Sequence, residues 1–182
     1  MKKTGFSTLF AFLLTCFSYA QDPGALLFYL SADHGASADY AQGDPHPNFL
    51  ANVSVVRDGA RGEALHCGYR QLLAWKAPAN IYASEGTLSF FWRGAEPFTP
   101  TEFPIFRVSF ADHSSWDMTW LRIDYNGHGF DAFVTDNNLA RIRVSTTVDS
   151  LPDPSRWTHF ALSWDETRGI RFYLDGREVA RR

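Results

Sequence analysis

Residues 157–180 read WTHFALSWDETRGIRFYLDGREVA, and this stretch decides the fold. Large apolar residues occupy every second position in two runs: Phe160, Leu162 and Trp164, then Ile170, Phe172 and Leu174. Successive side chains of a strand point to opposite faces, so each run has one buried face and one face in water. Asp175-Gly176 follows the second run and tolerates the positive φ angles of a tight hairpin. The stretch therefore predicts antiparallel strands packed against an interior.

The same alternation recurs earlier in the chain. It is found over Thr87–Arg93, Trp120–Tyr125 and Arg141–Ser145. The pattern of the second stretch places Leu121, Ile123 and Tyr125 on an inner face and Trp120, Arg122 and Asp124 on an outer one. Asn126-Gly127 then supplies a second hairpin turn. Since no window combines a helical apolar period with caps, the predicted fold is all-β, an antiparallel two-sheet sandwich.

Three stretches resemble laminin-G-like domains, which belong to the concanavalin A-like lectin/glucanase jelly rolls. The sharpest is Trp157–Ala180, where an alternating strand ends in Trp-Asp and an apolar strand runs into an Asp-Gly hairpin. Gly86–Trp92 and Leu26–Asp33 are similar to earlier family strands, although Ser31-Ala32-Asp33 stands where the family prefers Phe-Asp-Gly. The resemblance implies one jelly-roll domain over residues 21–182. The family has at least one more strand after this hairpin, so we expect a domain that lacks its last strand, in either a longer protein or a truncated gene product.

The N-terminus has the parts of a secretory signal peptide. Two of the first three residues are lysines, residues 5–17 are mainly apolar, and small residues precede a predicted cleavage after Ala20. This predicts a leader over residues 1–20 and a secreted, periplasmic or cell-surface protein. The alternative is a lipoprotein signal that is acylated on Cys16.

Composition excludes several function classes. The chain has 182 residues, is 45% hydrophobic and carries a formal net charge of −3, which fits one globular domain and offers no basic field to nucleic acid. After the leader its one cysteine, Cys67, is predicted to be a small buried hydrophobe.

The histidines show no zinc-ligand spacing. Retaining glycosidases need two carboxylates about 5 Å apart, and no two glutamates lie two to four residues apart, which leaves only aspartate-based catalysis open.

Outward strand faces supply the candidate ligand residues. Arginine forks suit carboxylate or sulfate groups, and the family resemblance implies that Trp or Tyr rings hold sugars on the concave sheet or its rim. The predicted ligand-binding residues are Trp116, Trp120, Arg122, Asp124, Arg143, His159 and Tyr173. The alternative is that the arginines form cross-strand pairs on a solvated sheet and that the tryptophans belong to the core.

Residues 112–117 and 124–131 are dense in oxygen donors. The second segment is not an EF-hand, because Thr135 stands where the twelfth-position glutamate would be. Many laminin-G-like domains hold calcium at the sheet rim, so the resemblance implies a calcium site with Asp33, Asp112, Asp117 and Asp131 as candidate ligands. The alternative is turn chemistry, in which Asp and Asn side chains bond their own backbone.

These residues and the resemblance together predict an exported, non-catalytic recognition module. Its expected partner is a carbohydrate or a cell-surface protein, with calcium as the implied ion and no nucleic acid or transmembrane segment. The alternative is a structural or appended domain of a larger secreted enzyme or adhesin, and a glycosidase is the third choice.

Overall fold

The computed structural model describes residues 25–67, 72–94, 102–109, 119–135, 141–148, 153 and 155–182. Over these residues the chain is all-β, and its paired strands run antiparallel. Those ranges contain no helix that is long and apolar enough to cross a membrane. The predicted leader over residues 1–20, including Cys16, lies outside the described residues.

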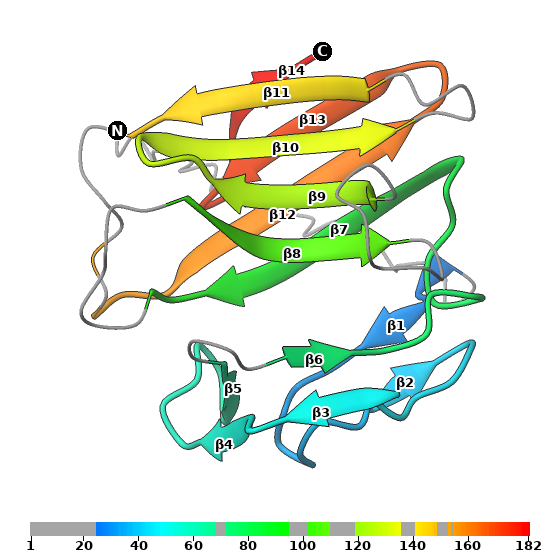
Figure 1. Cartoon of the computed structure of the whole chain (residues 1–182), viewed down its shortest axis with the longest axis vertical. Helices are drawn as coiled ribbons and strands as arrows, with labels where there is room; N and C mark the ends of the chain where they lie inside the picture. Colours follow the sequence, from blue (N-terminus) through cyan, green and yellow to red (C-terminus); the bar gives the residue numbers. More distant parts are fainter. Residues whose placement is uncertain are drawn as a thin grey trace, which may run out of the picture.

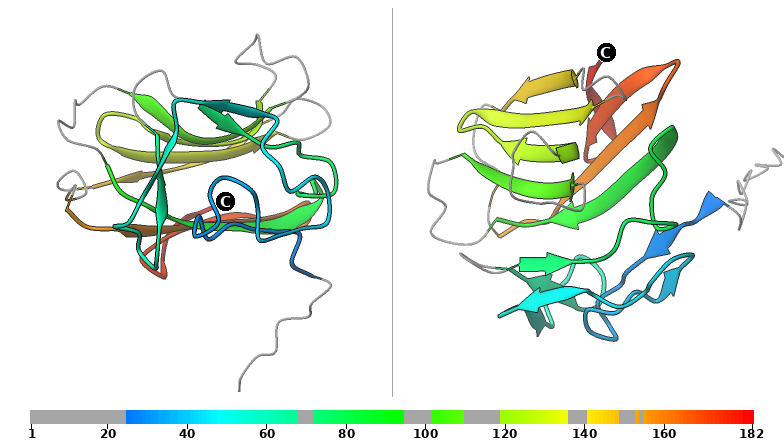
Figure 2. Two further views of the ribbon diagram at one scale, coloured as in Figure 1. Left: turned by 90° about the horizontal axis from the view of Figure 1, so that it is seen from below. Right: turned by 45° about the vertical axis from the view of Figure 1, so that its right-hand side comes forward.

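Two four-stranded sheets form the body of the molecule (Figure 1). The front sheet has the order β11-β10-β9-β8 and consists of β8 (Phe103–Ser109), β9 (Thr119–Tyr125), β10 (Gly129–Thr135) and β11 (Arg141–Thr147). The back sheet has the order β14-β13-β12-β7 and consists of β7 (Glu85–Trp92), β12 (Thr158–Asp165), β13 (Gly169–Leu174) and β14 (Arg177–Arg181). Figure 2 shows the two sheets stacked as layers. The predicted antiparallel two-sheet sandwich is confirmed, while the finer jelly-roll topology stays a prediction.

The interior between the sheets is rich in aromatic rings, and β12 supplies its centre. Residues along β12 alternate between buried and half-buried, and Phe160, Leu162 and Trp164 are 0%, 0% and 5% exposed. The Phe160 ring lies 5.5 Å from Phe90 of its own sheet and 5.0 Å from Phe130 of the front sheet. The inward face predicted for this strand is therefore confirmed.

Both predicted hairpin turns are present. Asn126-Gly127 lies between β9 and β10, and Asp175-Gly176 lies between β13 and β14. Asp175 and Gly176 have φ angles of 47° and 77°, and positive φ at both central residues is what a type I′ turn requires. Arg182 continues the ladder past β14 through two backbone hydrogen bonds with Ile170, of 2.8 and 3.0 Å.

Residues 25–67 and 72–74 form an N-terminal layer that lies beside the β7 and β8 edges of the two sheets (Figures 1 and 2). It contains three two-stranded ladders, which are β1 (Phe28–Tyr29) with β2 (Tyr40–Ala41), β3 (Phe49–Ala51) with β6 (Leu72–Ala74), and β4 (Ser54–Val56) with β5 (Ala64–His66). Within the described ranges, no strand of this layer pairs with the front or back sheet. The strand expected over Leu26–Asp33 is thus only two residues long and has a partner on one side.

Short strands leave the N-terminal layer with little interior of its own. Phe49, Leu50 and Leu72 are 49%, 53% and 54% exposed. Cys67, which follows β5, is exposed as well. The prediction that Cys67 is a buried hydrophobe is therefore wrong, because the ladder beside it is too small to cover its side chain.

Replacing Trp164 with alanine is expected to lower the free energy of unfolding by about 3–5 kcal/mol, the range for truncating a buried aromatic residue. The Trp164 ring packs edge-on against Trp120 at 5.6 Å, and its Nε1–H donates to the Tyr82 carbonyl at 3.0 Å. Urea unfolding followed by circular dichroism measures the loss. Phe91→Ala, at a residue that is 47% exposed, is the control and should lose less than about 1 kcal/mol. Equal losses in the two variants would contradict the inward orientation of Trp164.

Candidate functional site on the front sheet

The predicted ligand residues separate onto two opposite faces of the sandwich. Arg122, Asp124 and Arg143 alternate with core residues of β9 and β11 and point outward from the front sheet. His159 and Tyr173 alternate with core residues of β12 and β13 and point outward from the back sheet. The structure therefore does not bring these residues into one site.

The predicted tryptophan platform is not found on the described surface. Trp116 lies outside the described residues. Trp120 is 8% exposed and packs edge-on against Trp164 with a ring separation of 5.6 Å. Trp120 is thus a core residue, and its ring face is not open to a ligand.

On the back sheet, His159 and Tyr173 lie among ordinary cross-strand neighbours. The His159 Nε2 atom is 2.8 Å from Ser89 Oγ, and its ring is 5.0 Å from the Phe91 ring. Tyr173 is half-buried on β13. Such contacts stabilise a solvated sheet face and need no ligand.

Strand register gathers arginines on the outer face of the front sheet. Arg107 of β8 is opposite Arg122 of β9, and Arg122 is opposite Phe133 of β10. Phe133 is in turn opposite Arg143 of β11. Arg141 lies two positions before Arg143 and so shares its face. The guanidinium carbons of Arg122 and Arg141 are 5.7 and 5.4 Å from the Phe133 ring centroid, within the range of a cation–π contact.

Two carboxylates complete this set, which we call the arginine face: Arg107, Arg122, Asp124, Asp131, Phe133, Arg141 and Arg143. Its four guanidinium groups outnumber its two carboxylates, whereas the whole chain carries a net charge of −3. Burial lowers the pKa of Arg107, and the neighbouring Arg122 charge lowers it further. An arginine nevertheless stays protonated at neutral pH. The arginine face is therefore locally positive on a negatively charged protein.

Asp131 holds its charge through hydrogen bonds. The residue is 3% exposed, Asn126 Nδ2 donates to its Oδ1 at 3.0 Å, and Arg143 donates to its Oδ2. Burial raises the pKa of Asp131, but hydrogen bonds from Ser145, Arg143 and Asn126 together outweigh burial and leave that pKa below its usual value. Both carboxylate oxygens of Asp131 are thus occupied.

Asp124 is opposite Asp131 in the β9–β10 ladder. The two residues differ in their hydrogen bonds and in the direction of their pKa shifts. Asp124 is 8% exposed, and its Oδ2 pairs with the Arg122 side chain, while its buried Oδ1 accepts no hydrogen bond from the described part of the chain. Burial raises the pKa of Asp124, and the Arg122 guanidinium offsets only part of that rise. An unpartnered buried acceptor is unfavourable, and because Oδ1 is itself buried it is not open to a ligand from solution.

The two aspartates differ from the carboxylate pair of a glycosidase. Retaining hydrolysis needs one protonated carboxyl group and one carboxylate that is free to attack the sugar. Asp131 is almost fully buried, and its oxygens accept hydrogen bonds from Asn126 and Arg143. The two aspartates of the arginine face therefore do not form the carboxylate pair that retaining hydrolysis requires.

The candidate calcium ligands do not come together in the described part of the chain. Asp112 and Asp117 lie outside it. Asp33 belongs to the N-terminal layer, where its Oδ1 accepts a hydrogen bond from the Glu63 amide at 2.7 Å, whereas Asp131 lies on β10. Across the described ranges, no three His, Cys, Asp or Glu side chains are grouped so as to hold a metal ion. Asp33 and Asp131 therefore do not fit a shared calcium ion.

The site residues predicted from the sequence omit three members of the arginine face: Arg107, Phe133 and Arg141, the last of which begins the alternating stretch Arg141–Ser145. Arg107 alternates with Phe106 and Val108, a pattern that could have identified its outward orientation. Phe133 gave no such signal, because an apolar strand residue is expected to face the core. Only the register with Arg122 and Arg143 reveals its position.

No protein-family model matches the chain, and no curated protein matches its sequence. Among solved structures it is similar to the binding domain of Paraclostridial Mosquitocidal Protein 1, with a TM-score of 0.55 and 10% sequence identity. The match covers 87% of this chain and 39% of that chain, so this chain spans about two fifths of its neighbour. At this identity the likeness shows a shared fold.

Asp131→Asn is expected to lower the free energy of unfolding by roughly 1–3 kcal/mol at pH 7, because it removes a buried charge-assisted hydrogen bond. A carboxyl group whose pKa is lower in the folded state stabilises the fold above its unfolded-state pKa. That stabilisation is lost as pH falls through the folded-state pKa. The difference between wild type and variant should therefore be largest near neutral pH and disappear in acid.

Denaturant unfolding at a series of pH values measures this difference. Glu178→Gln is the control, since Glu178 makes only looser ion pairs, at 3.9 Å to Arg171 and 3.6 Å to Arg181. A stability difference for Asp131→Asn that stays constant with pH would show that its charge is not what matters.

Proposed function

We propose that this chain is an exported, non-catalytic recognition module whose arginine face binds glycans that carry carboxylate or sulfate groups. The observation that carries the proposal is the local excess of guanidinium groups on a chain of net charge −3. Opposite charge draws an anionic ligand to such a face and orients it there.

The side chains of the arginine face complement a charged sugar. Arg107 and Arg141 are exposed, and the Arg143 side chain is 60% exposed. A guanidinium fork can donate two parallel hydrogen bonds to a carboxylate or sulfate group. Several guanidinium forks side by side suit a ligand that carries more than one anionic group, as an acidic glycan does.

Two further features support a binding role outside the cell. The leader predicted over residues 1–20 directs export, and the stretch Trp157–Ala180 favours membership of the laminin-G-like family. The mosquitocidal protein domain that shares the fold is described as a binding domain. We extend to this chain only the binding role, because the likeness does not identify a ligand.

Calcium is a separate part of the proposal. The described aspartates give no support for an ion, so any calcium site would depend on Asp112 and Asp117. A glycan array probed with and without a chelator tests this part, since loss of binding with the chelator is expected only if calcium takes part. No glycan bound in either condition would favour the alternative of a structural or appended domain.

The double variant Arg107→Gln/Arg141→Gln is expected to weaken binding to sulfated or uronic-acid glycans at least about tenfold, since a hydrogen bond to a charged group contributes about 1.5–3 kcal/mol. Its unfolding free energy should change by less than about 1 kcal/mol, because both side chains are exposed. Binding should also fall as salt rises.

Arg171→Gln/Arg177→Gln is the matched control, because it removes the same charge from the back sheet. Titration of each variant with a glycan selected on the array measures affinity, and a neutral glycan of equal length tests charge dependence. Equal weakening by the two double variants would contradict a site on the arginine face.

A further inference from the structure

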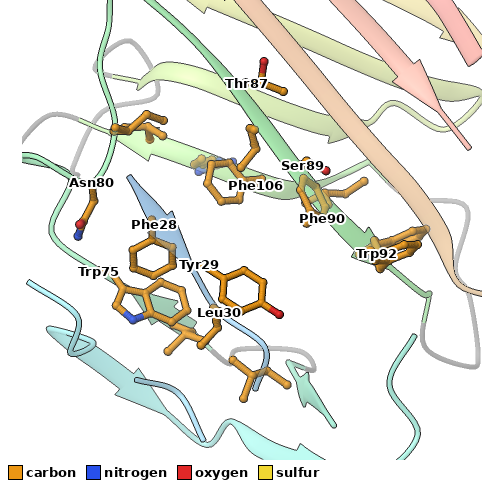
Figure 3. Close-up of a pocket in the computed structure, with 18 of the residues that line it drawn as sticks. Phe28, Tyr29, Leu30, Trp75, Asn80, Thr87, Ser89, Phe90, Trp92 and Phe106 are labelled. Atoms are coloured by element: carbon orange, nitrogen blue, oxygen red, sulfur yellow. The ribbon is translucent and has the colours of Figure 1, made fainter. Parts of the chain in front are cut away.

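The sandwich has an open side, and the N-terminal layer covers it. The back sheet ends at β7 and the front sheet ends at β8, so both edges face the same side. A groove of about 3470 Å³ runs between these edges and the N-terminal layer. Figure 3 shows Phe28, Tyr29 and Trp75 on one side of the groove and Phe90, Trp92 and Phe106 on the other. The groove is several times larger than the roughly 300–1,000 Å³ of a small-molecule site.

The N-terminal layer is anchored to the sandwich at one end of the groove. Trp164 Nε1 donates to the Tyr82 carbonyl at 3.0 Å, and the Glu166 amide donates to the Ser84 carbonyl at 3.1 Å. Tyr82 and Ser84 lie in the segment that leads from the N-terminal layer into β7. These bonds fix that segment beside the end of the β7–β12 pair where Glu85 is opposite Asp165.

A second attachment lies at the other end of the same strand pair. Asp58 Oδ2 accepts a hydrogen bond from Arg93 Nη1 at 2.7 Å, and the Asp58 carbonyl accepts one from Trp157 Nε1 at 3.2 Å. The Arg93 guanidinium carbon also lies 4.7 Å from the Trp157 ring centroid. Arg93 and Trp157 flank the cross-strand pair Trp92–Thr158. We call Asp58, Arg93 and Trp157 the clasp.

The two attachments are separated by the length of β7, eight residues, or roughly 25 Å at the rise of an antiparallel strand. Between them, the described strands of the N-terminal layer pair only with one another. The edge of β7 that is not paired with β12 therefore faces the groove, and no strand of the described chain pairs with it.

We propose that residues 25–67 and 72–74 form a lid over the β7 edge, hinged at residues 75–84 and held closed by the clasp. The clasp is readily opened, because the Asp58 side chain is 78% exposed and its ion pair is open to screening by salt. The covalent and hydrogen-bonded hinge keeps the lid attached when the clasp opens. Opening exposes the backbone groups of an edge strand, which are a template for pairing with another strand. The lid thus controls access to that edge.

Hydrogen–deuterium exchange on the full chain tests the lid. Asp58→Asn and Arg93→Gln should each raise exchange roughly tenfold over β7 and over β4–β5, the loss expected for one charge-assisted hydrogen bond and its cation–π contact. Exchange over β9 and β10 should not change. His34→Gln is the control, because it changes an exposed side-chain contact with Asp39, at 2.8 Å, that lies within the N-terminal layer and outside both the hinge and the clasp.

A salt titration of the unmodified chain gives a second measurement that needs no variant. Raising the salt from about 0.05 to 1 M shortens the Debye length to about 3 Å, so exchange over β7 should rise toward that of Asp58→Asn. Unchanged exchange in both clasp variants would overturn the proposal. A rise spread equally over the core strands would also overturn it, because the clasp would then stabilise the whole fold. This test involves no glycan, so its outcome is independent of the function proposed for the arginine face.

Discussion

Burial of the Phe160 ring between the two sheets is the constraint on which the rest of the structure depends. That ring contacts Phe90 at 5.5 Å, Phe130 at 5.0 Å and Phe172 at 6.0 Å, so one residue of β12 packs against both sheets. Because strand residues alternate, an inward Phe130 orients Asp131 outward on β10. The arginine face is therefore a consequence of how the core packs.

The sequence predicts which residues are buried in the interior between the sheets, but it does not predict which residues are buried on the outer faces of the sheets. β12, β13 and the two hairpin turns follow from local alternation and from turn dipeptides, and the structure confirms them. In β9, however, Trp120 and Asp124 are both 8% exposed although the alternation predicted them in water. Local periodicity reports the side of a strand, but the burial of the outer side depends on distant parts of the chain.

The site was harder to predict for a related reason. Alternation assigns a residue to a face of its strand but does not say which sheet the strand joins, so alternation alone allows His159 and Arg122 to share a site. Strand order separates them, and register then aligns Arg107 with Arg122 and Phe133. Only the turn between β9 and β10 has an Asn-Gly dipeptide that defines register locally. The remaining alignment of the front sheet becomes known from the structure alone.

The sandwich is stabilised by its buried aromatic core, whereas the N-terminal layer consists of short ladders with little buried apolar area. The layer can therefore open while the sandwich stays folded. Isolated two-stranded ladders are marginally stable in water, and those of the layer are two or three residues long. Segments with little buried apolar area open at the lowest free-energy cost. β8 links the two parts, because it borders the groove with its edge and carries Arg107 on its outer face. β8 therefore borders both the groove and the arginine face, while the core around Phe160 belongs to the sandwich alone.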